Sequence, residues 1–108
     1  MSRRPILAEA RTPDGVRVVL FEDTWLIHIL NPDGGHAELE PYLQAVLDTL
    51  ASPDHRESER WPHRERFFRR DAGPTGWLMV VVDSAKEPAR VVTAFGYGHG
   101  RSPDGWAP

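Results

Sequence analysis

Two short apolar runs in the second half of the chain place the strongest constraint on its fold. They are Leu78–Asp83 and Arg90–Phe95, and only six residues separate them. Each run is rich in valine and has the length of a β-strand rather than that of a helix. The pair therefore predicts two strands of a sheet, joined by a turn around Ser84–Ala89.

A β-hairpin is predicted near the start of the chain. The segment Thr12-Pro13-Asp14-Gly15 has the composition of a tight turn. It lies between Ile6–Arg11 and Val16–Phe21, which both have strand length. These three segments together predict two antiparallel strands.

A short helix is predicted next, with Asp23 as its capping residue. Such a helix would place Trp25, His28 and Ile29 on one face. Trp25, Ile27 and Ile29 also alternate as the residues of a strand would, so periodicity alone leaves both structures open.

The clearest helical pattern follows after the loop 31–35. Its apolar residues recur at spacings of three and four and form one stripe: Leu39, Tyr42, Leu43, Val46, Leu47 and Leu50. Pro41 must lie near the first turn, because a proline in the interior would interrupt the backbone hydrogen bonds. Pro53 ends the helix.

Two further strands are predicted in His55–Trp61 and Glu65–Arg70. We therefore expect an α+β fold in which N-terminal helices pack on a four-stranded antiparallel sheet, together with the N-terminal β-hairpin. A single domain is expected over residues 1–108, with a core over about residues 16–95 and a flexible tail over about residues 96–108.

The composition excludes several classes of protein. A chain of 108 residues with 40% apolar residues can form one packed core. No apolar run approaches the roughly 20 residues that cross a bilayer. The chain has no cysteine for a disulfide or a thiolate metal site, and its five histidines include no HExxH pair. We expect a cytoplasmic protein with no membrane partner, no metal and no cofactor.

The basic residues are almost all arginine and are concentrated in one segment. The net charge is −3, which argues against a surface that attracts nucleic acid everywhere. However, 12 of the 13 basic residues are arginine, and six lie within fifteen positions: Arg56, Arg60, Arg64, Arg66, Arg69 and Arg70. Three glutamates in the same window leave a balance of +3. Arginine is well suited to bidentate contact with phosphate, so this segment is a candidate for binding it.

Four residues are candidates for a phosphodiester site. His28 would lie at the margin of the core, and His36 would lie where the glycine-containing loop meets the long helix. Strand alternation places Arg66 on one face with Phe68, and Thr93 on one face with Val91 and Phe95, opposite Val92 and Ala94. Taken singly, each of these residues also fits an ordinary structural role.

Taken in order, short motifs along the chain resemble a known group of nucleases. The motifs are Trp25-Leu-Ile-His28-Ile29, His36-Ala-Glu-Leu39, Pro53-Asp54, Arg64-Glu-Arg66-Phe-Phe68-Arg69, Trp77-Leu-Met-Val-Val-Val82 and Val91-Val-Thr93-Ala94-Phe95. They look like the phage- and toxin-associated branch of the barnase–EndoU–colicin–RelE (BECR) nucleases, over about Val16 to Phe95. The chain departs from the family pattern in one place. The second histidine follows the first by eight positions instead of a few, and Ala37 replaces the proline that usually follows it.

The resemblance implies a metal-independent ribonuclease, and the residue types fit that chemistry. In RNA the 2′-hydroxyl is the nucleophile, so cleavage by transesterification needs one group to remove its proton and another to protonate the leaving 5′-oxygen. Histidine can serve either role, since its ordinary pKa is about 6.5. We assign His28 as acid or base, His36 as the second candidate, Arg66 as the phosphate clamp and Thr93 as an orienting donor. Arg69, Tyr97 and Trp61 are candidates for substrate binding, the two aromatic residues by stacking on an unpaired base.

Three hypotheses of function stay open on the sequence. The first is a toxin-type ribonuclease that acts on RNA and has an antitoxin or immunity protein as its partner. The second is a catalytically inactive protein of the same fold that serves as a binding or interaction module, which the net acidity favours. The third is a small protein of unrelated function with a similar strand pattern.

Overall fold

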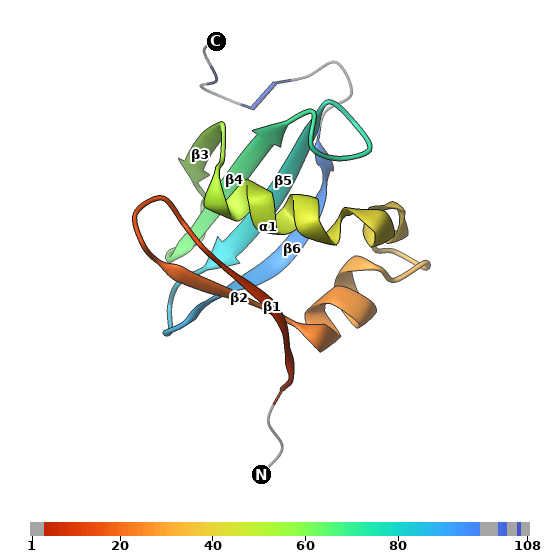
Figure 1. Cartoon of the computed structure of the whole chain (residues 1–108), viewed down its shortest axis with the longest axis horizontal. Coiled ribbons are helices and arrows are strands. Elements are labelled where there is room, and N and C mark those ends of the chain that lie inside the picture. The colour runs from red at the N-terminus through yellow and green to blue at the C-terminus, as the bar shows by residue number, and fades with distance from the viewer. Residues whose placement is uncertain (1–3, 98–101, 104–105, 107–108) are drawn as a thin grey trace.

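A six-stranded mixed β-sheet is the framework of the protein (Figure 1). The structure is a computed structural model, and it describes residues 4–97, 102–103 and 106. The strand order across the sheet is β1-β2-β6-β5-β4-β3. The strands are β1 (Ile6–Arg11), β2 (Arg17–Phe21), β3 (His55–Ser58), β4 (Arg64–Arg70), β5 (Trp77–Asp83) and β6 (Ala89–Tyr97).

The predicted four-stranded antiparallel sheet is wrong, because the N-terminal hairpin belongs to the same sheet. β3, β4, β5 and β6 pair with their neighbours in antiparallel fashion. The hairpin of β1 and β2 extends this group, since β2 pairs with β6 in parallel. The parallel contact consists of only two residue pairs, Val18 with Ala89 and Val19 with Arg90. A contact this short leaves no pattern in the sequence, so the hairpin could be predicted but its position in the sheet could not.

The prediction of N-terminal helices is also wrong, because the described chain has a single α-helix and it follows the hairpin. This helix is α1 (Leu43–Ala51), and Figure 1 shows it lying across one face of the sheet. The predicted first turn is a separate 3₁₀ segment, η2 (Ala37–Tyr42), which contains Pro41. The predicted short helix is η1 (Thr24–Ile29), a six-residue π-type segment. Asp23 does not cap it, because its carboxylate accepts hydrogen bonds from Arg4 instead. No described helix is long and apolar enough to span a bilayer.

The main core lies between the sheet and the helical segments. Its fully buried side chains include Leu20 from β2, Ile29 from η1 and Leu39 from η2. Val46 and Leu50 of α1 pack in the same cluster, as the apolar stripe predicts. The sheet contributes Val18, Phe67, Leu78, Val80, Val82, Ala89, Val91 and Ala94 to this face.

The opposite face of the sheet carries a second, mostly aromatic cluster. Phe68, Trp77, Met79 and Val81 form its buried part. Trp106 packs against it, with its ring centroid 5.0 Å from that of Trp77. The predicted flexible tail includes Gly96 and Tyr97, which belong to β6, while residues 98–101, 104–105 and 107–108 lie outside the described part of the chain.

A β-bulge in β6 changes which residues share a face. Val82 of β5 is opposite Val91, but Val81 is opposite Thr93, so Val92 is an extra residue between the two pairs. Val91 therefore faces the main core, whereas Thr93 lies on the aromatic face with Phe95. The predicted common face of Val91 and Thr93 is wrong for this reason.

Candidate functional site

A hollow beside β6, bordered by η1, contains two of the predicted site residues, His28 and Thr93. Its volume is about 460 Å³, and it lies between η1, the start of the chain and the strands β4 and β6. Its polar lining consists of Arg4, Thr24, His28, Arg64, Arg90 and Thr93. We call it the arginine hollow. It combines one imidazole, two hydroxyls and three guanidinium groups on one concave surface.

The sheet contributes Arg64 from β4 and both Arg90 and Thr93 from β6, with β5 between the two strands. Arg64 of β4 is opposite Asp83 of β5, and Asp83 is opposite Arg90 of β6. Because Arg64, Asp83 and Arg90 are aligned across the sheet, their side chains project from the same face. The bulge at Val92 turns Thr93 to this face as well.

η1 contributes His28 from the other side of the arginine hollow. Trp25 and Ile29 anchor η1 in the core, with exposed fractions of 4% and 0%, and leave His28 exposed. Thr24 is buried, and its hydroxyl accepts a hydrogen bond of 3.1 Å from Arg4. Segments of π-helix are rare and often occur at functional sites. Because Trp25 and Ile29 are buried, the imidazole of His28 is held at the rim of the arginine hollow, where solvent and a ligand can reach it.

Two carboxylates offset part of the positive charge around the arginine hollow. Arg4 pairs with Asp23 at 2.7 Å, and Arg64 pairs with Asp83 at 3.3 Å. The pKa of Asp83 is held below its usual range because the Ala85 amide donates a hydrogen bond to it and because Arg64 and Arg90 lie nearby. Arg90 is exposed, and it lies near Asp83 without forming a salt bridge among the described residues. Three guanidinium groups against two carboxylates leave one positive charge, before any charge on His28.

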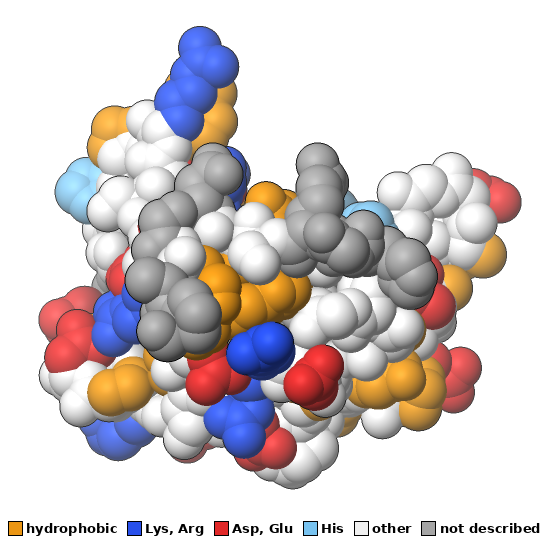
Figure 2. All heavy atoms as spheres, turned by 90° about the horizontal axis from the view of Figure 1, so that it is seen from above, with side chains coloured by type: hydrophobic (Ala, Val, Ile, Leu, Met, Phe, Trp, Pro, Cys, Tyr) orange, Lys and Arg blue, Asp and Glu red, His pale blue; other side chains and the backbone are white. Residues whose placement is uncertain are grey.

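The described residues on the face of the molecule in Figure 2 do not form one continuous basic patch. Figure 2 shows basic and acidic side chains interleaved on the face that it presents. Three of the six arginines in the arginine-rich segment have acidic partners, namely Arg56, Arg64 and Arg66. Attraction of an anion is therefore concentrated at particular sites instead of being spread over the protein.

His36 lies close to the backbone of η1 but outside the lining of the arginine hollow. Its amide donates a hydrogen bond to the Ile29 carbonyl oxygen. Its ring stacks on Phe95, with 5.0 Å between centroids and 28° between the ring planes. Phe95 follows Thr93 by two residues on the same face of β6, so His36 stands one position further along that face.

Arg66 shares the face of Thr93 but is separated from it by β5. The two residues are both paired with Val81, so their backbones are roughly 10 Å apart. Arg66 pairs with Glu57 at 3.2 Å, and its Nε is 3.5 Å from Glu59. The structure therefore brings His28 and Thr93 together with Arg64 and Arg90, and it places Arg66 in an acidic setting to one side.

The three predicted substrate-binding residues lie in three different places. Arg69 is on the helical face of the sheet, where it donates a hydrogen bond to the Ser52 carbonyl at the end of α1. Tyr97 packs in the aromatic cluster, with its ring centroid 5.2 Å from that of Phe68. Trp61 is 62% exposed in the loop between β3 and β4. Of the three, only Trp61 lies beside a residue of the arginine hollow, namely Arg64.

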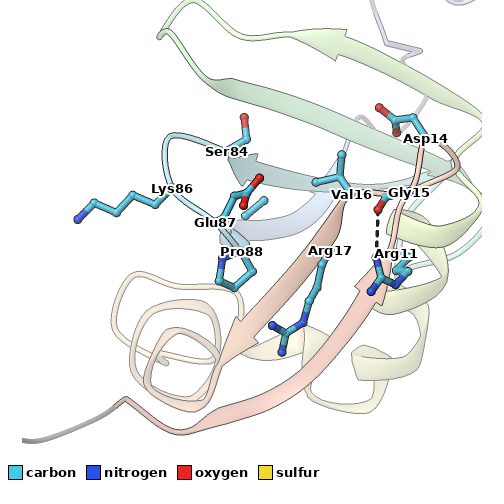
Figure 3. Close-up of a pocket in the computed structure, with 10 residues that line it drawn as sticks. Arg11, Asp14, Gly15, Val16, Arg17, Ser84, Lys86, Glu87 and Pro88 are labelled. Atoms are coloured by element: carbon cyan, nitrogen blue, oxygen red, sulfur yellow. Dashed lines mark hydrogen bonds between the residues drawn. The ribbon is translucent and has the colours of Figure 1, made fainter.

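A larger hollow, of about 630 Å³, lies between the hairpin turn and the loop that joins β5 to β6 (Figure 3). Its charged groups do not converge. Figure 3 shows Lys86 extending away from the other lining residues, and Arg11 donating a hydrogen bond to the Gly15 carbonyl. Arg17 is paired with Glu9. The described residues that line it include no histidine, so its size is the only feature that favours it as a functional site.

No specific role in the site is predicted from the sequence for Arg4, Arg64 or Arg90, although Arg64 belongs to the arginine-rich segment. Arg90 does carry a signal, since it is a guanidinium at the start of a strand of valines. The bulge hides its relation to Thr93, because regular alternation would place residues 90 and 93 on opposite faces. Arg4 carries no signal, since tertiary contacts with Phe21, Asp23 and Thr24 hold it at the site. The described residues contain no group of three or more potential metal ligands.

Comparison with known proteins adds no relative: no protein-family model matches the sequence, and no curated protein or solved structure is significantly similar to it. The resemblance to the BECR nucleases therefore stays a prediction.

Proposed function

We propose that the protein is a metal-independent ribonuclease that cleaves RNA at the arginine hollow. One observation carries the proposal: His28, Thr93, Arg64 and Arg90 line the same concave surface. An imidazole, a hydroxyl and two guanidinium groups are the groups that transesterification at a phosphodiester uses.

The chemistry needs no reactant other than the RNA strand. A base removes the proton from the 2′-hydroxyl, whose oxygen attacks the adjacent phosphorus. The bond from phosphorus to the 5′-oxygen breaks, and an acid protonates that oxygen, which leaves a 2′,3′-cyclic phosphate and a 5′-hydroxyl. His28 performs one of these proton transfers, and His36 is the candidate for the other.

The arginines stabilise the transition state, which carries more negative charge than the substrate. Arg90 is suited to bind a phosphate oxygen because it is exposed and forms no salt bridge in the described part of the chain, although Asp83 lies nearby. Arg64 would have to exchange its contact with Asp83 for one with the phosphate. The Thr93 hydroxyl donates a hydrogen bond to a second phosphate oxygen. Arg66 can act as a phosphate clamp only by leaving Glu57 and Glu59.

The test is cleavage of a single-stranded RNA by purified protein in EDTA. We expect cyclic-phosphate products, and at least a tenfold lower rate in His28→Ala and in Arg90→Ala. Arg11→Ala is the matched control, because it removes an exposed arginine at the larger hollow and should leave the rate unchanged. Equal rates in all three variants would refute the site. Arg66→Ala then decides whether that residue belongs to it.

A binding module without catalysis is the second candidate. The pairing of Arg4 and Arg64 with carboxylates favours it, since these two guanidinium groups are already engaged and are less available to stabilise a transition state. RNA binding that depends on Arg90, without cleavage of any RNA, would support this alternative. The toxin role and the antitoxin partner stay predictions.

A further inference from the structure

Trp61 is the most exposed large aromatic side chain in the described part of the chain. It is 62% exposed, whereas Trp25 and Trp77 are each 4% exposed. Tryptophan is usually well buried, because its ring has a large apolar surface. An indole left in solvent is therefore a candidate contact surface for a ligand.

Trp61 borders a hollow of about 480 Å³, together with Pro62, Arg64 and Asp83. We call it the tryptophan hollow. Arg64 lines both this hollow and the arginine hollow, so the two meet at its side chain. An aromatic surface thus lies next to the group of cations that would hold a phosphate.

The loop that carries Trp61 is held at both ends by backbone hydrogen bonds. The Arg64 amide donates to the Trp61 carbonyl at 3.3 Å, and the Glu59 amide donates to the Arg64 carbonyl at 3.0 Å. The His63 carbonyl accepts from both the amide and the hydroxyl of Ser84, at 2.8 and 3.2 Å, which ties the loop to the one after β5. The backbone that carries the indole is therefore held in place before any ligand binds, which lowers the entropy lost on binding.

We propose that Trp61 is a stacking platform for an unpaired base next to the phosphodiester held in the arginine hollow. The inference rests on the proposed function and names its substrate class, which is single-stranded RNA. A base can stack on Trp61 only if it is outside a duplex. Because every base has an aromatic face, the platform selects unpaired nucleotides rather than a particular sequence.

Binding to an RNA that cannot be cleaved tests this proposal apart from catalysis. A 2′-O-methyl RNA oligonucleotide lacks the nucleophilic hydroxyl and is the probe. We expect Trp61→Ala to weaken its binding roughly 5- to 150-fold, the range for loss of one stacked base. Trp61→Tyr should restore most of the affinity, since it keeps an aromatic face. Val16→Ala is the control, because it truncates another exposed apolar side chain at 40% exposure and should have no effect.

The position of the stacked base can be found with abasic nucleotides. One abasic position should weaken binding to the wild-type protein but not to Trp61→Ala, because both changes remove the same contact. The same sequence as a duplex should bind more weakly than the single strand.

The outcomes separate the platform from the nuclease. If the wild-type protein binds the probe through Trp61 but cleaves no RNA, the platform stands and the proposed function fails. If RNA is cleaved at the His28 site while Trp61→Ala binds the probe as the wild type does, the platform fails and the function stands. Self-association that Trp61→Ala abolishes, with unchanged RNA binding, would make the indole a protein contact and overturn the inference.

Discussion

Arg90 and Thr93 lie on the same face of the sheet although they are three positions apart in one strand. Regular alternation would put them on opposite faces. The bulge at Val92 removes the conflict, because it inserts one residue between the pairs that Val91 and Thr93 make with β5. Bulges are common beside active sites, where they redirect a side chain. The irregularity in β6 is therefore what assembles the strand side of the arginine hollow.

Removing only the hydroxyl of Thr93 should lower the rate of RNA cleavage. Thr93→Val keeps the shape of the side chain but loses the donor to the phosphate. A hydrogen bond to a charged group contributes about 1.5–3 kcal/mol, which corresponds to a rate loss of roughly 10- to 150-fold. Thr93→Ser keeps the hydroxyl and should retain most of the activity. A Thr93→Val variant that folds normally and cleaves at the wild-type rate would remove Thr93 from the mechanism.

Replacement of Gly35 by alanine should disturb both histidines. A Cβ atom on Gly35 would lie 2.6 Å from the carbonyl oxygen of His28 and 2.7 Å from that of Ile29. Both distances are well below van der Waals contact, so the loop or η1 must move. We expect Gly35→Ala to lose about 1–3 kcal/mol of unfolding free energy in urea, the usual range for overpacking. Cleavage should fall as well, because His28 and His36 shift.

Asp33→Ala is the control for this change, since it alters an exposed residue of the same loop. Its effect on stability should stay within about 0.5 kcal/mol. Equal unfolding free energies of the two variants would show that a side chain at position 35 does not clash with the backbone of η1.

Truncation of Leu20 tests whether the hairpin is part of the fold. Leu20 is 0% exposed in the main core, whereas Leu7 on the neighbouring strand is 38% exposed. Leu20→Ala should lower the unfolding free energy by about 2–5 kcal/mol. Leu7→Ala should change it by about 0.5 kcal/mol or less. Urea denaturation measures both, and similar small losses would show that the hairpin is an appendage.

The local elements of this fold could be predicted from the sequence, because their signals are local. The hairpin, the apolar stripe of α1 and the last four strands all appear close to their predicted bounds. The way in which these elements combine could not be predicted. The parallel contact pairs Val18 and Val19 with residues of β6 that lie about 70 positions further along the chain. No local sequence pattern indicates a contact of only two residue pairs.

The candidate site, like the fold, could be predicted from the sequence only in part. His28 and Thr93 could be chosen from the sequence because their residue types suit the chemistry, and the arginine hollow contains both. Arg66 could not be ranked against Arg64 from the sequence. Both are arginines of one strand on one face, and only the structure shows that Arg66 pairs with Glu57 and Glu59.

The hairpin turn should make the stability of the protein depend on acid pH. Asp14 in this turn accepts a hydrogen bond of 2.7 Å from Arg56 of β3 and one from Thr12. These contacts, chiefly the one with Arg56, lower the pKa of Asp14 from 3.8 to about 2. Because the folded protein favours the ionised carboxylate, the contribution is present above about pH 4 and is lost as the pH falls toward 2.

Asp14→Asn should therefore be less stable than the wild type at pH 7, and the two proteins should converge near pH 2. The measurement is the urea midpoint of both proteins at several values of pH between 2 and 7. The difference should shrink at high salt, since the pair is exposed to solvent. It should also shrink in an Arg56→Ala background, because the main partner of the carboxylate is then absent. A difference that stays constant from pH 7 to pH 2 would show that the ionised carboxylate of Asp14 does not hold the turn against β3.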